Sequence, residues 1–215
     1  MKVAVMQPYF IPYTGYFRLF TQADQFVILD DVQFPRRGWV HRNRLTSNNH
    51  QLNWLTLPLK KVSQETKINK MVFSKNALVQ FNKQLPKFKI FQDDNNFNNS
   101  IVMKMFQFEL PLVDYLEYLL KEICEQLNIQ FNIVRSSKLG LNNTVTGNKR
   151  IIEIVKTVGA STYINSPGGK SLYYTEDFNC ANIKLEFLPE WSGDYASILQ
   201  RILTENTDNI RKEII

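Results

Sequence analysis

The fold is decided by residues 2–31, which read KVAVMQPYFIPYTGYFRLFTQADQFVILDD. Two apolar runs, 2–6 and 26–30, have the length of buried strands, and a proline-rich loop with a short helix capped by Thr14 separates them. Two strands joined by a helix over so short a distance form a parallel βαβ unit with a right-handed crossover. We therefore expect an α/β protein built on a three-layer, Rossmann-like parallel sheet.

The loop after the first strand should face a ligand, because ligands of parallel sheets bind beyond the carboxyl ends of the strands. Gln7 follows the strand, and its carboxamide can both donate and accept hydrogen bonds. Tyr9 and Tyr13 can stack on a sugar or base ring, and the prolines of the loop stiffen the backbone between them. The other aromatic side chains of the loop are expected in the hydrophobic core: Phe10, Tyr16 and Phe17.

The second strand ends in a pair of acids, Asp30 and Asp31, with Gln33 two residues further on. Paired acids at a strand end can hold Mg²⁺, act as a general base or orient an amine. The plain alternative is a polar turn in which Asp30 caps or pairs with a nearby arginine. We expect at least one acid in the site, Asp31 rather than Asp30 if Val27 and Leu29 point inward, and we assign no metal ligands.

The tightest basic cluster follows in residues 35–44, PRRGWVHRNR. Arg42 and Arg44, with Asn43 between them, should point to one side of an extended segment and suit a diphosphate. Pairing of these arginines with Asp30 or Asp31 is the alternative. His41 stands among arginines, which lower the pKa of its imidazole, so a neutral His41 could serve as a base.

A second loop directly after a strand, NSPGGK at 165–170, adds Ser166, Gly168, Gly169 and Lys170. Glycines after a strand let backbone N–H groups approach a phosphate or an oxyanion, and the lysine adds charge. The spacing is not that of a P-loop, and an ordinary turn would use the same residues.

The remaining pattern predicts a single domain over 1–215, with a mostly helical insertion or subdomain around 67–128. Residues 109–128 form the clearest helix, since their apolar side chains recur at helical spacing. The other expected elements are strands at 52–59, 131–134, 161–165 and 183–187, and helices at 74–85, 147–158 and 195–204.

Composition narrows the class of protein. The 215 residues carry a formal net charge of +6, which is compatible with nucleic acid, a membrane surface or a phosphorylated substrate. We expect no nucleic-acid partner, because the arginines gather in one loop and no nucleic-acid motif is present. No apolar run has the roughly 18 residues of a membrane span. Two cysteines far apart fit a reducing cytoplasm.

Three stretches together resemble the WbqC-like family of bacterial proteins: MQPYFIPYTGYFRLF, ADQFVILDDVQFPRRGWVHRNRL and GASTYINSPGGKSLY. They match the family pattern in order, and weaker similarity extends over nearly the whole chain. The resemblance implies a role in the synthesis of bacterial surface polysaccharide, including O-antigen. It does not by itself imply a reaction.

Within that setting we expect a transferase that moves an acyl or aminoacyl group from a donor to the amine of a nucleotide-linked amino sugar. A homo-oligomer is compatible with the sequence. The first alternative is a nucleotidyltransferase-like enzyme or ligase that uses ATP with Mg²⁺, because YTGY has the spacing of the HxGH signature. Tyrosines replace the two histidines of that signature poorly. A non-enzymatic basic binding module is the further alternative.

Overall fold

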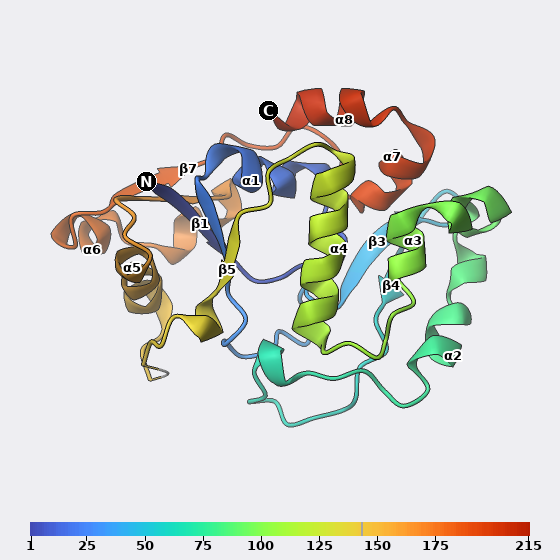
Figure 1. Ribbon diagram of the computed structural model, residues 1–215, viewed down its shortest axis with the longest axis horizontal. Helices are drawn as coiled ribbons and strands as arrows, with labels where there is room; N and C mark the ends of the chain where they lie inside the picture. The colour runs from blue at the N-terminus through green and yellow to red at the C-terminus, as the bar shows by residue number, and fades with distance from the viewer. Residues whose placement is uncertain (143) are drawn as a thin grey trace.

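The computed structural model describes residues 1–142 and 144–215. Its main sheet has five parallel strands in the order β5-β2-β1-β6-β7 (Figure 1). The strands are β1 (Lys2–Met6), β2 (Gln25–Ile28), β5 (Ile133–Arg135), β6 (Thr162–Asn165) and β7 (Lys184–Phe187). The expected α/β fold with a parallel sheet is confirmed.

The strand order reverses in the middle of this sheet. After β1 the chain adds β2 and then β5 on one side, and it returns to place β6 and β7 on the other side. The crossovers on the two sides of β1 therefore diverge, and a crevice opens outside the carboxyl ends of β1 and β6. Gln7 and Ser166 are the first residues after the carboxyl ends of β1 and β6.

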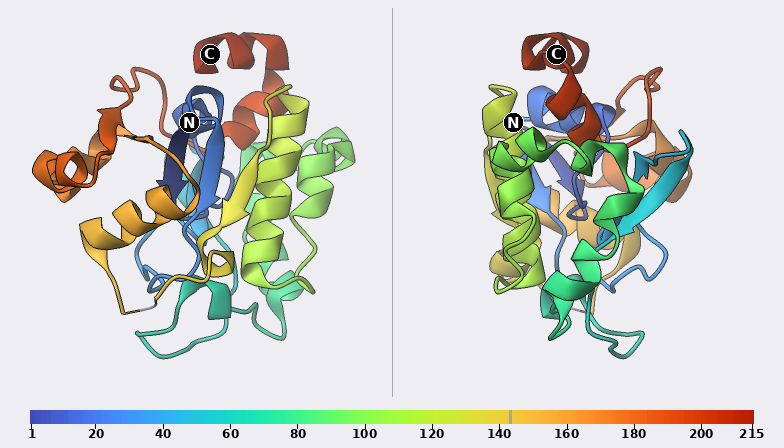
Figure 2. Two further views of the ribbon diagram at one scale, coloured as in Figure 1. Left: turned by 60° about the vertical axis from the view of Figure 1, so that its left-hand side comes forward. Right: turned by 90° about the vertical axis from the view of Figure 1, so that its right-hand side faces the viewer.

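Helices cover both faces of the sheet (Figure 2). The side chain of Ala4 lies in one buried cluster together with Leu116 and Leu120 of α4 (Leu112–Gln126). The neighbouring Val3 and Val5 lie in a second cluster, on the side of α5 (Gly147–Thr157) and α6 (Thr175–Cys180). Successive side chains of a strand point to opposite faces, so β1 is buried between two helical layers.

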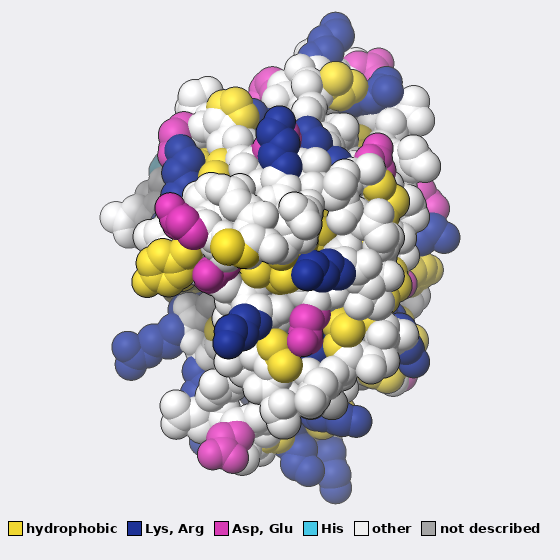
Figure 3. Space-filling view, turned by 90° about the vertical axis from the view of Figure 1, so that its left-hand side faces the viewer, with side chains coloured by type: hydrophobic (Ala, Val, Ile, Leu, Met, Phe, Trp, Pro, Cys, Tyr) yellow, Lys and Arg dark blue, Asp and Glu magenta, His cyan; other side chains and the backbone are white. Residues whose placement is uncertain are grey.

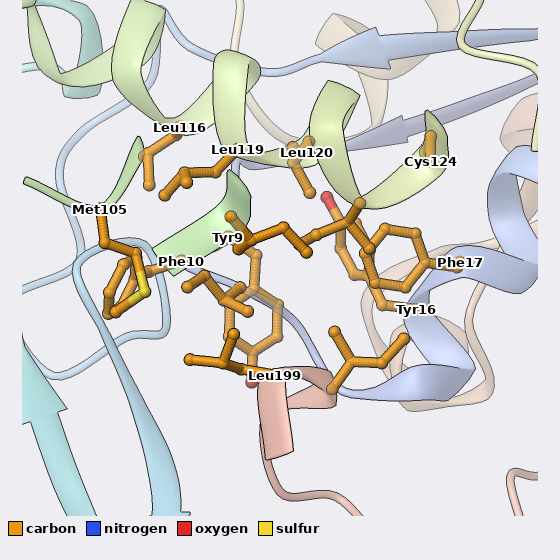
Figure 4. Packing of buried hydrophobic residues seen from close by; sticks show 14 of the residues in the cluster. Tyr9, Phe10, Tyr16, Phe17, Met105, Leu116, Leu119, Leu120, Cys124 and Leu199 are labelled. Carbon is orange, nitrogen blue, oxygen red and sulfur yellow. The ribbon is translucent and has the colours of Figure 1, made fainter. Parts of the chain in front are cut away.

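Three aromatic residues of the opening loop lie in the hydrophobic core, as expected from the sequence, and Tyr9, 9% exposed, belongs to the same buried cluster. Phe10, Tyr16 and Phe17 are at most 3% exposed, and Figure 4 shows them below Leu116, Leu119 and Leu120 of α4. The loop leads into a short 3-10 helix, η1 (Thr14–Phe17), and then α1 (Arg18–Gln22). The expected cap is wrong, because Tyr13 occupies the N-cap and Thr14 already belongs to the first turn.

Residues 42–56 form a separate antiparallel hairpin of β3 (Arg42–Thr46) and β4 (Leu52–Thr56). Arg44 pairs with Trp54 across it. The following segment is largely helical, and its buried Phe81, Phe88 and Met105 share one cluster with the opening loop and α4. Its elements are η2 (Ile68–Lys70), α2 (Ala77–Asn82), η3 (Leu85–Lys87), η4 (Lys89–Phe91), η5 (Asp94–Asn98) and α3 (Ser100–Lys104).

The remaining elements are η6 (Ser136–Lys138), η7 (Pro167–Leu172), α7 (Ile198–Thr204) and α8 (Thr207–Ile214). The sequence analysis does not predict α8, although Asn206 caps this helix and Ile210 and Ile214 are buried on its inner side. No helix in the described parts of the chain is long and apolar enough to cross a membrane. On the face that Figure 3 shows, lysine and arginine side chains are scattered among acids rather than gathered in one patch.

Candidate functional site

A cavity of about 910 Å³ occupies the crevice outside β1 and β6. Gln7, Asp31 and Ser166, which follow the ends of β1, β2 and β6, line it from the sheet. The first turn of α5, including Arg150, and the η7 turn line its other sides. We call this space the large cavity.

A second hollow of about 370 Å³ lies beside the first, and several aromatic side chains line it. Tyr9, Tyr13, Trp39 and Tyr195 line it together with the side chain of Arg44. Neighbouring rings are in contact, with centroids 5.5 Å apart for Tyr9 and Trp39 and 4.9 Å apart for Tyr13 and Tyr195. We call this space the aromatic compartment.

The two spaces are adjacent, because four residues line both of them: Met6, Gln7, Trp39 and Ser166; we refer to the two spaces together as the cleft. The crevice of a doubly wound sheet is where such folds bind their ligands, and concave sites with a few polar groups are the usual form of small-molecule sites. The structure thus brings Ser166 beside Gln7, Tyr9 and Tyr13, although more than 150 residues separate it from them in the sequence.

Asp30 and Asp31 have different surroundings. Asp30 is 1% exposed, and its carboxylate accepts hydrogen bonds from the amide of Ser137 (2.9 Å) and the hydroxyl of Ser137 (2.7 Å). Asp31 lines the large cavity. The hydroxyl of Ser136 lies 2.6 Å from the carboxylate of Asp31 and 3.1 Å from that of Asp30. Asp30 therefore holds β2 to the η6 turn, and Asp31 is the acid that a ligand can reach.

The partner of Asp31 is Arg150 in the first turn of α5, not an arginine of the 36–44 segment. The two side chains form a hydrogen-bonded ion pair, with 5% of the Arg150 side chain and 7% of the Asp31 side chain exposed. Arg150 also donates to the carbonyl oxygen of Asn142 at 2.8 Å. The pair joins the floor of the large cavity to the helix above it.

The predicted diphosphate residues Arg42 and Arg44 share one face of the hairpin but have different surroundings. Arg44 lines the aromatic compartment. Arg42 lines neither space of the cleft, since its guanidinium lies 4.1 Å from the ring centre of Trp54 and donates to the carbonyl oxygen of Arg37. Asn43 is 1% exposed and donates to the carbonyl oxygen of Ile11, so it supports the opening loop and does not reach a ligand.

Burial sets the protonation of the aromatic compartment. It raises the pKa of the Tyr9 phenol, with a further rise from Tyr13 and an opposing effect of Arg44. It likewise raises the pKa of Tyr13. Both phenols are therefore protonated at neutral pH and can donate a hydrogen bond.

His41 has the low pKa that the sequence predicts, but not the expected place. Burial, with a smaller effect of Arg42, lowers its pKa to about 4, so the imidazole is neutral at pH 7. It lines a different hollow with Phe34, Arg36 and Leu57. A base must reach the proton that it removes, and the structure does not bring His41 to the cleft.

The turn at 165–170 contributes unevenly. Ser166, Gly168 and Gly169 line the large cavity, whereas Lys170 is exposed and lines neither space of the cleft. The amide of Gly169 donates to the carbonyl oxygen of Ser166 at 3.0 Å, which removes it from the predicted oxyanion donors. The hydroxyl of Ser166 remains as a donor between the two spaces.

Two further predictions concern neighbouring residues. Gln33 lines the large cavity, and its side-chain amide donates to the carbonyl oxygen of Gln64 at 2.8 Å. Tyr16, the second tyrosine of YTGY, is 3% exposed and donates to the carbonyl oxygen of Gln7. It cannot serve a phosphate as the second histidine of an HxGH signature would.

Sequence reasoning missed Arg150, Asn165 and Tyr173, which line the large cavity, and gave Trp39 no role. The position of Arg150 in the sequence could have indicated a nearby anion, because a cation in the first turn of a helix interacts unfavourably with the helix dipole. In the described residues, no group of three or more histidine, cysteine, aspartate or glutamate side chains is arranged to hold a metal ion.

Comparison with known proteins identifies the family of this chain. The uncharacterized protein Rv1507c of Mycobacterium tuberculosis is 27% identical over 192 residues, which span 86% of this chain and 80% of that protein. No solved structure matches. A model of the WbqC-like protein family matches residues 7–201, from the opening loop through the hairpin and the η7 turn to α7, and this protein therefore belongs to the WbqC-like protein family.

Proposed function

We propose that this protein is a transferase of bacterial surface-polysaccharide synthesis that acts on a nucleotide-linked amino sugar in the cytoplasm. The observation that carries the proposal is the two-part cleft at the point where the strand order reverses, with Gln7 and Ser166 between its parts. A ligand with two dissimilar halves suits such a cleft better than a compact one. The family resemblance supports the biological setting.

The two parts differ in chemistry in a way that suits the two halves of this substrate. The large cavity presents the carboxylate of Asp31, which can accept a proton from an amine or hold it by hydrogen bonds. The aromatic compartment presents Arg44, which forms no ion pair within the described part of the chain. We assign the sugar amine to Asp31 and the diphosphate to Arg44.

The proposed reaction is transfer of an acyl or aminoacyl group to that amine. The amine nitrogen attacks the carbonyl carbon of the donor, a C–N bond forms, and the bond from that carbon to the leaving group breaks. Asp31 takes the proton from the nitrogen and passes it to the leaving group. Ser166 and Gln7 supply hydrogen bonds to the carbonyl oxygen as negative charge develops on it.

A thermal-shift screen tests the proposal. The ligands are UDP-, GDP- and dTDP-linked amino sugars, coenzyme A thioesters, and ATP with Mg²⁺. A ligand at a hundredfold excess over its Kd stabilises the folded protein by about 2.7 kcal/mol, which raises Tm by roughly 5–11 °C for a chain of this size. Gln7→Ala and Arg44→Ala should reduce the shift that a nucleotide-linked sugar produces.

The control variants are Gln92→Ala and Arg37→Ala, which remove exposed side chains of the same two kinds outside the cleft. They should leave the shift unchanged. A shift with ATP alone would favour the nucleotidyltransferase-like alternative. The proposal fails if no nucleotide-linked sugar shifts Tm, or if Gln7→Ala and Gln92→Ala behave alike.

A further inference from the structure

Two tryptophans lie exposed beside the mouth of the cleft. Trp39 is 38% exposed and Trp54 is 40% exposed, and their ring centroids are 4.9 Å apart. Single exposed hydrophobic residues are ordinary, but two large rings in contact form an apolar patch that calls for an explanation.

Arginines accompany both rings. The guanidinium of Arg42 lies 4.1 Å from the ring centre of Trp54, and that of Arg44 lies 5.2 Å from the ring centre of Trp39. The hairpin register puts Arg42, Arg44 and Trp54 on the same face, since Arg44 pairs with Trp54. We call these four residues, Trp39, Arg42, Arg44 and Trp54, the Trp–Arg platform.

The positive charge of the platform is not neutralised within the described residues. Neither Arg42 nor Arg44 forms an ion pair there, and the buried Nε of Arg44 has no hydrogen-bond partner. The backbone oxygens of Arg37 and Gly38 hold the Arg42 guanidinium in place, at 2.7 and 3.3 Å. An anion is the partner that such a surface lacks.

The platform is the outer continuation of the cleft. Trp39 lines both the large cavity and the aromatic compartment, and Arg44 lines the aromatic compartment. A ligand whose diphosphate lies at Arg44 therefore has two directions left, inward to Asp31 and outward over Trp54.

We propose that the Trp–Arg platform binds the nucleobase of the substrate by stacking and its diphosphate through Arg44 and Arg42. The inference rests on the proposed function and assigns the nucleotide half of the substrate to the outside of the cleft. A planar base attached to two phosphates matches both the exposed rings and the unpaired charge. Stacking of a base on an aromatic side chain needs no enclosing pocket.

Isothermal titration of the intact protein, at one fixed ionic strength, tests the platform. The probes with a base are UDP, dTDP and GDP, and the probes without one are glucosamine 1-phosphate and inorganic pyrophosphate. Trp54→Ala is the decisive variant, because Trp54 lines neither part of the cleft. Trp54→Phe keeps an aromatic ring, and Leu52→Ala removes another exposed apolar side chain, 42% exposed, from the same strand.

We expect Trp54→Ala to weaken the binding of the nucleoside diphosphates by about 5- to 150-fold, the range for one stacked base. It should leave both probes without a base unchanged. Trp54→Phe should retain most of the affinity, and Leu52→Ala should behave as the parent protein. Quenching of tryptophan fluorescence by UDP should be smaller in Trp54→Ala.

Three results would overturn the platform. Trp54→Ala could bind nucleoside diphosphates unchanged, or lose affinity for both kinds of probe equally. It could also change the sedimentation coefficient without changing nucleotide binding, which would make the patch a contact between copies of the chain. If the parent protein binds nucleotide-linked sugars in any of these cases, the proposed function survives alone; if it binds none, both fail.

Discussion

The buried pair of Asp31 and Arg150 gives the sharpest prediction about stability. As whole residues, Arg150 is 4% exposed and Asp31 is 8% exposed, so each charge stays largely buried when its partner is removed. Replacing Arg150 by methionine keeps an unbranched, flexible side chain but removes the guanidinium. It leaves the Asp31 carboxylate with the hydroxyl of Ser136 at 2.6 Å, and it leaves the carbonyl oxygen of Asn142 without its donor.

Removal of one partner from a buried ion pair destabilises a protein by about 3–5 kcal/mol, because the other charge stays buried and unpaired. For a chain of this size that corresponds to a fall in Tm of roughly 6–20 °C. Asp31→Asn should cost about 3 kcal/mol, at the lower end, since its carbonyl oxygen still accepts a hydrogen bond. The double variant should lose less stability than the two single variants lose together, by roughly 2 kcal/mol.

Urea unfolding of the four proteins measures this cycle. The control is Lys121→Met, which breaks the exposed pair of Lys121 and Glu125, 3.6 Å apart and with both side chains more than half exposed. An exposed pair of this kind contributes about 0–1 kcal/mol. The reasoning is refuted if Arg150→Met costs no more than Lys121→Met, or if the losses of the two single variants simply add.

Three further predictions need one measurement each. Gly169→Ala should lower Tm and Gly168→Ala should not. A Cβ at residue 169 would lie 2.5 Å from the side-chain amide nitrogen of Asn165, whereas a Cβ at residue 168 would meet nothing within 4 Å. Equal Tm values would contradict this. The pKa of His41, lowered to about 4 by burial, means that the unfolded chain binds more protons between pH 6.5 and 4, so stability falls as the pH drops through that range. His41→Gln should flatten this fall and the exposed His50→Gln should not. A thiol reagent should modify exposed Cys180 in the native protein and buried Cys124, whose pKa burial raises, only in denaturant; rapid reaction of both thiols would contradict the burial.

The sheet could be predicted from the sequence because its strands are short apolar runs with loops at clear positions. The predicted strand at 2–6 matches β1, and those at 26–30 and 161–165 match β2 and β6 to within two residues at each end. The hairpin was predicted in part: the expected strand at 52–59 contains β4, although β4 exposes Leu52, Asn53 and Trp54, whereas β3 was expected only as an extended segment around Arg42 and Arg44. Packing against the rest of the chain, not local pattern, decides such a segment.

The alternation of side chains along β2 also indicates which acid, Asp30 or Asp31, faces the large cavity. Val27 belongs to the buried cluster on the side of α5 and the partly buried Leu29 packs against it, whereas Phe26 and Ile28 belong to the cluster on the side of α4. Asp31 continues the first row, and the large cavity lies on that side. Arg150 could not be found in this way, because the contact joins residues 119 positions apart and only the fold brings them together.

The same alternation explains why the basic segment could not act as one unit. In β3 the side chains of Asn43 and Leu45 are buried, whereas Arg42 and Arg44 point to the opposite face. His41 shares the parity of Asn43, and it lines a hollow outside the cleft while Arg44 lines the aromatic compartment. A base at His41 and an anion site at Arg44 therefore cannot serve one ligand group. Residue type alone suggested a joint site for the segment, and the strand register, which follows from the period of two, divides it into one buried face and one face that carries the arginines.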